Sequence, residues 1–185
     1  MNERIMHALR VKTAVFLMGL TLFLSCGAAQ GAGAREDNQA LLLPPSQEDQ
    51  TMLNRRLQTA KRDIEAFRIF AENFRSNGDT KALAQLQYPV DDFLKKHVDN
   101  LLAQSLQHAT LETTRLTAEI MFIKSRLFLC LNRGDAARKV VAEMKNRFGS
   151  YQKISVELPG KTTTLDEGIR LMEEELAKAD TAQKK

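Results

Sequence analysis

The sequence predicts an all-α protein that follows an N-terminal export signal. Residues 46–149 carry apolar side chains at helical spacings of three and four positions. The chain has only nine Gly and four Pro, and in this region they lie between the helical stretches, where such residues end helices. The hydrophobic fraction of 43% is close to that of globular domains. We therefore expect one helical domain whose helices run antiparallel across short connections.

The first 34 residues have the organisation of an export signal. Arg4, Arg10 and Lys12 precede an uninterrupted apolar run over residues 13–24, and small residues follow. A basic start, a short apolar core and a small-residue exit are typical of a secretory signal peptide. A membrane-spanning helix needs about 20 apolar residues, more than this run contains. The segment is therefore predicted to direct export rather than to span a membrane.

The end of the apolar run resembles a bacterial lipobox. The four residues Phe23-Leu24-Ser25-Cys26 are similar to the relaxed lipobox of spirochaete lipoproteins, although the common form has Leu three places before the Cys and a small residue two before it. The resemblance implies a signal peptide over residues 1–25 and an acylated Cys26 that holds the mature protein on a membrane of the cell envelope, facing the periplasm. Cleavage after Ala34, which fits the A-x-A rule, is the alternative. It would discard Cys26 and leave a soluble periplasmic or secreted protein.

Residues 26–45 lack helical periodicity and are predicted to form a flexible tether, followed by a single helical domain over residues 46–181. Cleavage before Cys26 removes three basic residues and one acid, so the net charge falls from +4 to +2. So small a charge gives no support to nucleic-acid binding. Cys130 would then be the single cysteine and could form no internal disulfide. Within its apolar run it is expected to be a small buried hydrophobic residue.

The first helix is predicted to begin at the S-x-x-D sequence of Ser46 and to end at Asn77-Gly78, with Asp79 or Thr80 capping the next helix. Its apolar face consists of Leu53, Leu57, Ala60, Ile64, Phe67, Ala71 and Phe74. Spacings of four and three keep these residues on one side of the helix for about six turns.

The middle of the chain is predicted to form three further helices. A short helix over residues 81–88 is expected to end at Pro89, and Asp91-Asp92 to cap the next helix. The apolar face of that next helix consists of Leu94, Val98, Leu101, Leu102 and Leu106. Three threonines predict a break near residues 109–114. The helix that follows, up to Leu131, is apolar on almost every side and is therefore expected to be the buried centre of the fold.

The last third of the chain is predicted to hold two helices. Gly134-Asp135 is expected to end the central helix as Gly78-Asp79 ends the first, and a helix over residues 136–148 follows. Residues 150–164 contain a strand-like alternation, but with no second strand visible we expect a loop. The last helix is predicted from about Thr164 to Ala179.

Residues 118–149 resemble a tetratricopeptide-type helical hairpin. The resemblance depends on Leu127-Phe128, Gly134-Asp135, Ala136-Ala137 and Phe148-Gly149. Residues 70–93 look like a looser copy, although the two Gly-Asp turns lie 56 residues apart and repeats of this family recur every 34. The resemblance implies stacked helix pairs with a concave groove that binds another protein. An irregular helical bundle is the alternative.

The candidate chemical sites have simpler interpretations. Gly160-Lys161-Thr162 lacks the first Gly of a phosphate-binding loop, because Ser155 stands there, so no nucleotide is expected. His97 and His108, with Glu112 one turn further, lack the spacing of a helical zinc site. We expect these histidines to be exposed or packed, and predict no metal and no cofactor.

The remaining charged clusters also have structural interpretations. The sequence has no G-x-S-x-G nucleophile motif, and the acidic residues 173–175 are expected to form a solvated face. Five basic residues are placed on the outer face of the first helix, where they could contact anionic lipid headgroups but are expected chiefly to keep that face soluble: Arg55, Arg56, Lys61, Arg62 and Arg68.

The leading hypothesis is a non-enzymatic, lipid-anchored scaffold or adaptor that binds another envelope protein through a helical-repeat surface. The alternative is a periplasmic carrier of a small hydrophobic ligand, enclosed among the Phe- and Met-containing helices. A third possibility is an enzyme whose site is not recognisable in one sequence.

Overall fold

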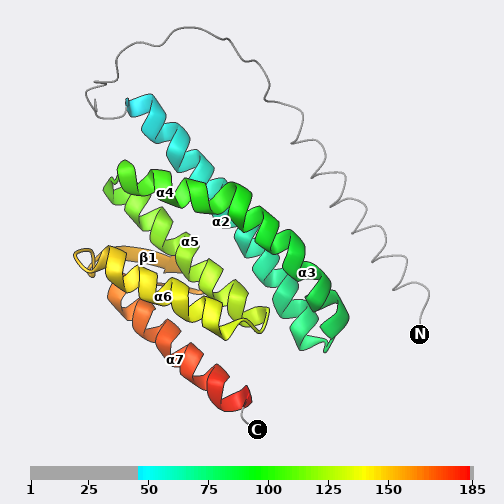
Figure 1. Cartoon of the computed structure of the whole chain (residues 1–185). Coiled ribbons are helices and arrows are strands. Elements are labelled where there is room, and N and C mark those ends of the chain that lie inside the picture. Colours follow the sequence, from blue (N-terminus) through cyan, green and yellow to red (C-terminus); the bar gives the residue numbers. More distant parts are fainter. Residues whose placement is uncertain (1–45, 184–185) are drawn as a thin grey trace, which may run out of the picture. The chain divides into compact units, whose positions relative to one another are not determined.

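The computed structural model describes residues 46–183, and these form a helical unit with one small β-hairpin (Figure 1). The predicted signal peptide, Cys26 and the predicted tether lie outside the described residues. The elements in chain order are α2 (Gln47–Ser76), α3 (Thr80–Phe93), the π-helical turn η1 (Leu94–Val98), α4 (Asp99–Gln107), α5 (Leu111–Cys130), α6 (Gly134–Phe148), β1 (Ser155–Leu158), β2 (Lys161–Thr164) and α7 (Leu165–Gln183). This content confirms the all-α class. Within the described residues, no helix is both long and apolar enough to cross a membrane.

Helix α5 is the centre of the fold, as its sequence predicts. It packs against α2, α4, α6, α7 and β1, so it is enclosed on nearly every side (Figure 1). Its buried apolar residues include Leu116, Ile120, Met121, Phe122, Ile123 and Leu127. A helix with apolar residues around its circumference excludes water only when neighbours cover all of its faces.

Helix α2 begins and ends where the sequence predicts. The backbone N–H of Asp49 donates to Ser46 Oγ at 3.1 Å, and the Asp49 carboxylate accepts from the Ser46 N–H, forming a capping box. Six of the seven predicted apolar residues are buried, and Phe74 is half-buried. Gly78 ends the turn with φ +68°, a conformation that glycine adopts without steric cost.

The prediction that Pro89 ends a helix is wrong. Pro89 lies inside α3, and α3, η1 and α4 follow one another without a break. Proline costs one backbone hydrogen bond, but Val90 and Leu94 beside it are buried in the core and hold the helix in place. Asp91 and Asp92 therefore cap no helix. They form ion pairs with Arg133 at 2.5 Å and with Lys96 at 2.8 Å.

The inward face of α4 differs from the prediction at one residue. Leu106 is 41% exposed, while Ser105 is buried and accepts a hydrogen bond from Thr117 Oγ1 at 2.8 Å. The π-helical turn η1 before α4 contains one more residue than an α-helical turn. The residues of α4 are therefore rotated about the helix axis relative to the positions that regular α-helical spacing predicts. The predicted break is confirmed, because α4 ends at Gln107 and Thr110 caps α5.

The turn between α5 and α6 does not copy the turn at Gly78. Asn132 adopts the positive φ of +59°, and Gly134 is the first residue of α6. Asparagine tolerates this conformation because its short polar side chain can bond locally.

Residues 150–164 form a hairpin and not the predicted loop. Strands β1 and β2 pair antiparallel, with Val156 opposite Thr163 and Leu158 opposite Lys161. Pro159-Gly160 makes the turn, with φ +86° at Gly160. Val156 and Leu158 are buried, whereas β2 presents no apolar residue at all, so its sequence carries no alternation to recognise.

Helix α7 begins at Leu165, where the Glu167 N–H donates to Thr164 Oγ1 at 3.4 Å, and continues to Gln183, beyond the predicted end at Ala179.

Candidate functional site

The histidines do not form a site together. His97 is exposed on η1, where its ring lies 5.5 Å from the ring of Phe93, and His108 is half-buried at the end of α4. Glu112 lies beyond the helix break and is bonded to Arg115. Within residues 46–183, no group of three or more His, Cys, Asp or Glu residues is arranged to hold a metal ion.

Gly160-Lys161-Thr162 lies in the hairpin turn and strand β2. A phosphate-binding loop joins a strand to the first turn of a helix, so that several N–H groups converge on phosphate. Here a strand follows the glycine, and the next helix begins only at Leu165.

Cys130 is half-buried at the end of α5, against the core, rather than fully buried as predicted. Burial raises the pKa of its thiol, with a smaller contribution in the same direction from Glu72. A raised thiol pKa lowers the fraction of reactive thiolate.

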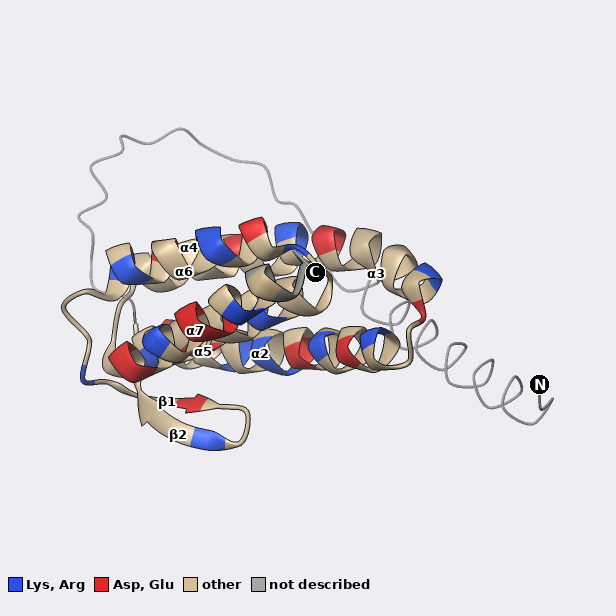
Figure 2. Ribbon diagram, turned by 90° about the horizontal axis from the view of Figure 1, so that it is seen from below, with Lys and Arg blue, Asp and Glu red and all other residues tan. Residues whose placement is uncertain are grey.

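The acidic residues 173–175 of α7 each bind a cation. Glu173 pairs with Lys145 at 2.7 Å, Glu174 pairs with Arg170, and Glu175 pairs with Arg126 at 2.5 Å. Two of the three pairs reach other helices, so this run attaches α7 to its neighbours as well as facing solvent. Figure 2 shows acidic and basic residues alternating along α7 and α2.

The five basic residues predicted on the outer face of α2 do not share one face, which corrects the prediction. The Arg68 guanidinium is largely buried and donates to Glu65 at 2.8 Å and Glu72 at 2.6 Å. Lys61 turns toward α5. The other three, Arg55, Arg56 and Arg62, are exposed.

A fully buried carboxylate lies where α2, α5 and β1 meet. Glu119 Oε2 accepts from Lys61 Nζ at 2.8 Å, and Glu119 Oε1 accepts the backbone N–H of Glu157 at 2.8 Å. The Glu157 carboxylate is 3.4 Å from the same Lys61 nitrogen. Sequence reasoning missed this cluster, although a Glu within the apolar run of α5 is a usable signal, because a buried carboxylate requires bonded partners.

Two shallow depressions lie on either side of Arg115. One lies between the start of α5 and the loop after α6, and the other lies between α2 and the hairpin. We call the two together the Arg115 groove. Its first part is lined by Leu111, Glu112, Arg115 and residues 149–155. Its second part is lined by Gln58, Lys61, Arg62, Glu65, Ala66, Ile69, Arg115, Leu116, Ile123, Glu157, Leu158 and Pro159.

Arg115 is only partly satisfied by its surroundings. Its Nη2 donates to Glu112 Oε1 at 2.8 Å, and this hydrogen bond raises the pKa of the Arg115 guanidinium. Its Nε is buried and has no hydrogen-bond partner among the described residues. A buried donor without a partner costs about 1–3 kcal/mol, so an acceptor that reached it would bind favourably.

The groove also exposes large apolar side chains. Leu111 is 71% exposed, and Tyr151 beside it is exposed, while Ile69 is exposed in the second part. Leu116, Ile123 and Leu158 are buried residues that form the floor of the second part. An apolar floor with paired charges at the rim has the composition of a protein-binding surface.

Comparisons with known proteins gave no relative: no protein-family model matches the chain, and we found no match among curated proteins or among solved structures.

Proposed function

We propose that the protein is an exported, lipid-anchored adaptor that binds another envelope protein in the Arg115 groove. The observation that carries the proposal is the groove itself, with exposed Leu111 and Tyr151 in its first part and exposed Ile69 above an apolar floor in its second part. Tyrosine and arginine are among the residues that most often dominate the binding energy of protein interfaces.

The packing order of the helices supports a repeat-like surface. Helix α2 contacts both its successor α3 and the more distant α5, and α5 likewise contacts α6 and α7. Stacked helical hairpins have this order, in which the first helix of each pair contacts the first helix of the next. The groove lies along α2 and α5, the first helices of two successive pairs.

Anchoring is tested by exchanging one cysteine at a time. We expect Cys26→Ala to release the protein from the membrane fraction, because acylation at Cys26 supplies the anchor. Cys130→Ala is the matched control and should leave the protein in the membrane fraction. If the Cys26→Ala protein stays in membranes after a high-salt wash, the lipid anchor is wrong.

Partner binding is tested with a photo-crosslinking residue in place of Ile69, in the groove, or of Lys139, an exposed residue on α6. The proposal predicts a discrete crosslinked product from position 69 that Arg115→Gln weakens. Equal products from both positions, or a product unaffected by Arg115→Gln, would contradict it.

The carrier hypothesis has less support. A carrier must enclose an apolar ligand, and the two depressions described above are open to solvent and have charged rims. Lipid that co-purifies in a fixed ratio would favour the carrier over the adaptor.

A further inference from the structure

The basic residues of helix α2 differ in what they contact. Lys61 and Arg68 are held by carboxylates of the protein, through Glu119 in one case and through Glu65 and Glu72 in the other. Their charges are already neutralised in the folded unit. They are therefore poorly suited to bind an external anion.

Arg75, in the last turn of α2, donates to the Leu129 carbonyl oxygen at 3.1 Å, and the remaining three arginines are exposed. Within residues 46–183, no carboxylate lies within ion-pair distance of Arg55, Arg56 or Arg62, and Arg56 makes a single hydrogen bond of 3.4 Å to the neutral Gln104. Arg55 and Arg62 are two helical turns apart and hence on the same side of α2. These three residues define what we call the arginine face.

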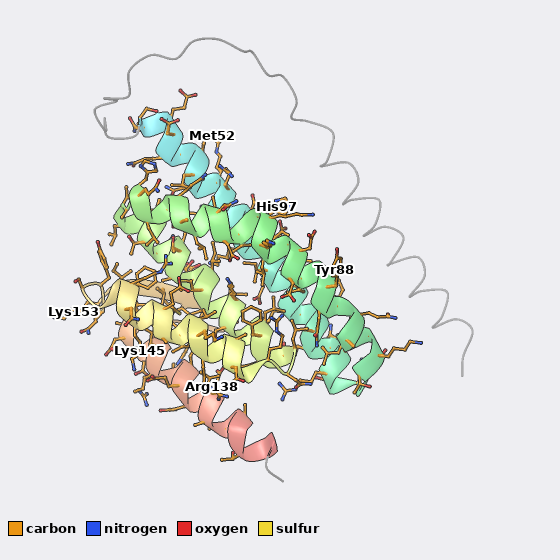
Figure 3. The ribbon with its side chains drawn as sticks, in the orientation of Figure 1. Met52, Tyr88, His97, Arg138, Lys145 and Lys153 are labelled. Carbon is orange, nitrogen blue, oxygen red and sulfur yellow. The ribbon has the colours of Figure 1, made fainter. Side chains whose placement is uncertain are left out.

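An apolar side chain and neutral residues accompany the arginine face. Met52, near the start of α2, is 53% exposed and lies one turn before Arg55 and Arg56 (Figure 3). Gln104 of α4 is exposed beside Arg56. The acids nearest in sequence are Asp63 and Glu65 after Arg62, and Asp49 and Glu48 before Arg55. Glu65 is paired with Arg68, and Asp49 is occupied by the capping box. Burial raises the pKa of Asp63, while the charge of Arg62 acts to lower it. Exposed arginines beside an apolar side chain are typical of surfaces that lie on anionic membranes.

We propose that the arginine face docks on anionic lipid headgroups of the membrane that carries the anchor, with Arg55, Arg56 and Arg62 binding phosphates and Met52 entering the headgroup layer. This inference rests on the proposed N-terminal anchor. The arginine face shares no residue with the first part of the Arg115 groove, and it shares only Arg62 with the second part.

The position of the arginine face along the chain favours a membrane over an acidic protein. Helix α2 starts at Gln47, and 19 residues separate its capping residue Ser46 from Cys26. The tether predicted from the sequence would have a root-mean-square span of about 25 Å. Such a tether would keep the first turns of α2 nearer the bilayer than the rest of the folded unit. A surface held at that distance meets headgroups at high effective concentration.

The test measures how close α2 lies to the bilayer. The proposed mature chain, residues 26–185, is attached to vesicles through an N-terminal histidine tag and a nickel-chelating lipid that is present at the same level in every preparation, so that attachment depends neither on lipidation nor on the signal peptide. Cys26→Ala and Cys130→Ser leave a single engineered cysteine for a fluorophore, either Thr59→Cys, between Arg55 and Arg62, or Lys139→Cys on α6. Nitroxide-labelled headgroups quench a fluorophore that lies at the membrane surface.

We expect strong quenching at position 59 on vesicles that contain phosphatidylglycerol and weak quenching on pure phosphatidylcholine. Salt that shortens the Debye length from about 10 Å to about 3 Å should abolish the difference. Arg55→Gln with Arg56→Gln should lower the ratio of docked to undocked protein about fivefold for each arginine. The control Lys81→Gln with Lys178→Gln removes the same charge elsewhere and should change little.

Equal quenching on both kinds of vesicle, or equal quenching at positions 59 and 139, would overturn the proposal. If the arginine variants leave quenching unchanged but weaken a crosslink to an acidic protein in cells, the face binds protein rather than lipid, and the membrane assignment is wrong. Failure of the proposed anchor gives a different result, because Cys26→Ala then fails to release the protein from cell membranes while vesicle docking persists.

Discussion

Lys61 Nζ lies 2.8 Å from the fully buried Glu119 Oε2, and this ion pair joins α2 to α5. The other Glu119 oxygen accepts the Glu157 N–H and so fixes the hairpin to the same point. One buried carboxylate thus connects three elements that border the Arg115 groove. A buried charge is stable only while its partners stay in place.

Lys61→Met should therefore destabilise the fold by about 1–3 kcal/mol in chemical denaturation, because Glu119 loses its counter-charge. The cost lies below that of breaking a wholly buried pair, since the Lys61 side chain is 24% exposed. Adding Glu119→Gln removes the unpaired charge and keeps an acceptor for the Glu157 N–H, so the double variant should recover most of the loss. A double variant less stable than Lys61→Met would show that the carboxylate has another role.

Gly168→Ala should destabilise the protein by about 1–3 kcal/mol, because overpacking forces a core to shift. A Cβ at position 168 would lie 2.7 Å from Cζ of Phe122, which is fully buried. Gly134→Ala is the matched control, since the nearest atom there is the flexible Arg138 guanidinium at 3.6 Å. It should be neutral or stabilising by the higher helix propensity of Ala. Equal thermal midpoints for the two variants would contradict the packing of α7 on α5.

The free energy of unfolding should respond differently to Leu127→Ala, in the core, and to Leu106→Ala, on the surface. Leu127 is fully buried in α5, so its truncation should cost about 2–5 kcal/mol. Leu106 is exposed at the end of α4, and its truncation should change stability by less than about 0.5 kcal/mol. Denaturant midpoints measure both. A large loss for Leu106→Ala would mean that this residue packs against something outside the described unit.

Cys130 should react slowly with iodoacetamide in the folded protein. Burial raises the pKa of its thiol above the ordinary 9.0, so the folded state favours the protonated form, which is unreactive. Because the folded protein favours the protonated thiol, the contribution of Cys130 to the free energy of unfolding is fully present below the ordinary thiol pKa. That contribution is lost as pH rises through the raised thiol pKa of the folded protein. The labelling rate should increase steeply above pH 9.0 and on unfolding. Labelling at pH 8 as fast as in denaturant would contradict the burial of this residue.

Helical periodicity was sufficient to predict most of the fold. The apolar face of α2 and the central position of α5 follow from spacing and composition, because burial of those residues leaves few alternatives. The continuity of α3 through Pro89 could not be predicted, since it depends on Val90 and Leu94 packing against a core that lies elsewhere in the sequence. Strand β2 could not be predicted, because its sequence has no apolar alternation and its extended conformation depends on hydrogen bonds to β1.

The candidate site was less accessible from the sequence than the fold. Arg115 and Glu119 lie on one helix, but the groove also needs the loop after α6 and the hairpin, and no periodicity relates these segments. The basic residues of α2 look alike in sequence. Glu65 and Glu72 stand three and four positions from Arg68, so that pairing is a local one that helical spacing makes possible. The pairing of Lys61 with Glu119, 58 residues away, is visible only in the structure.

The most direct test of the adaptor is whether a single polypeptide occupies both parts of the Arg115 groove. Photo-crosslinking residues are placed at Tyr151 and at Ile69 in separate strains, and the products are identified by mass spectrometry. We expect the same envelope protein from both positions, crosslinked through neighbouring residues of one segment, and loss of both products with Arg115→Glu. Different proteins from the two positions, or products that persist with Arg115→Glu, would show that the groove is not the binding site.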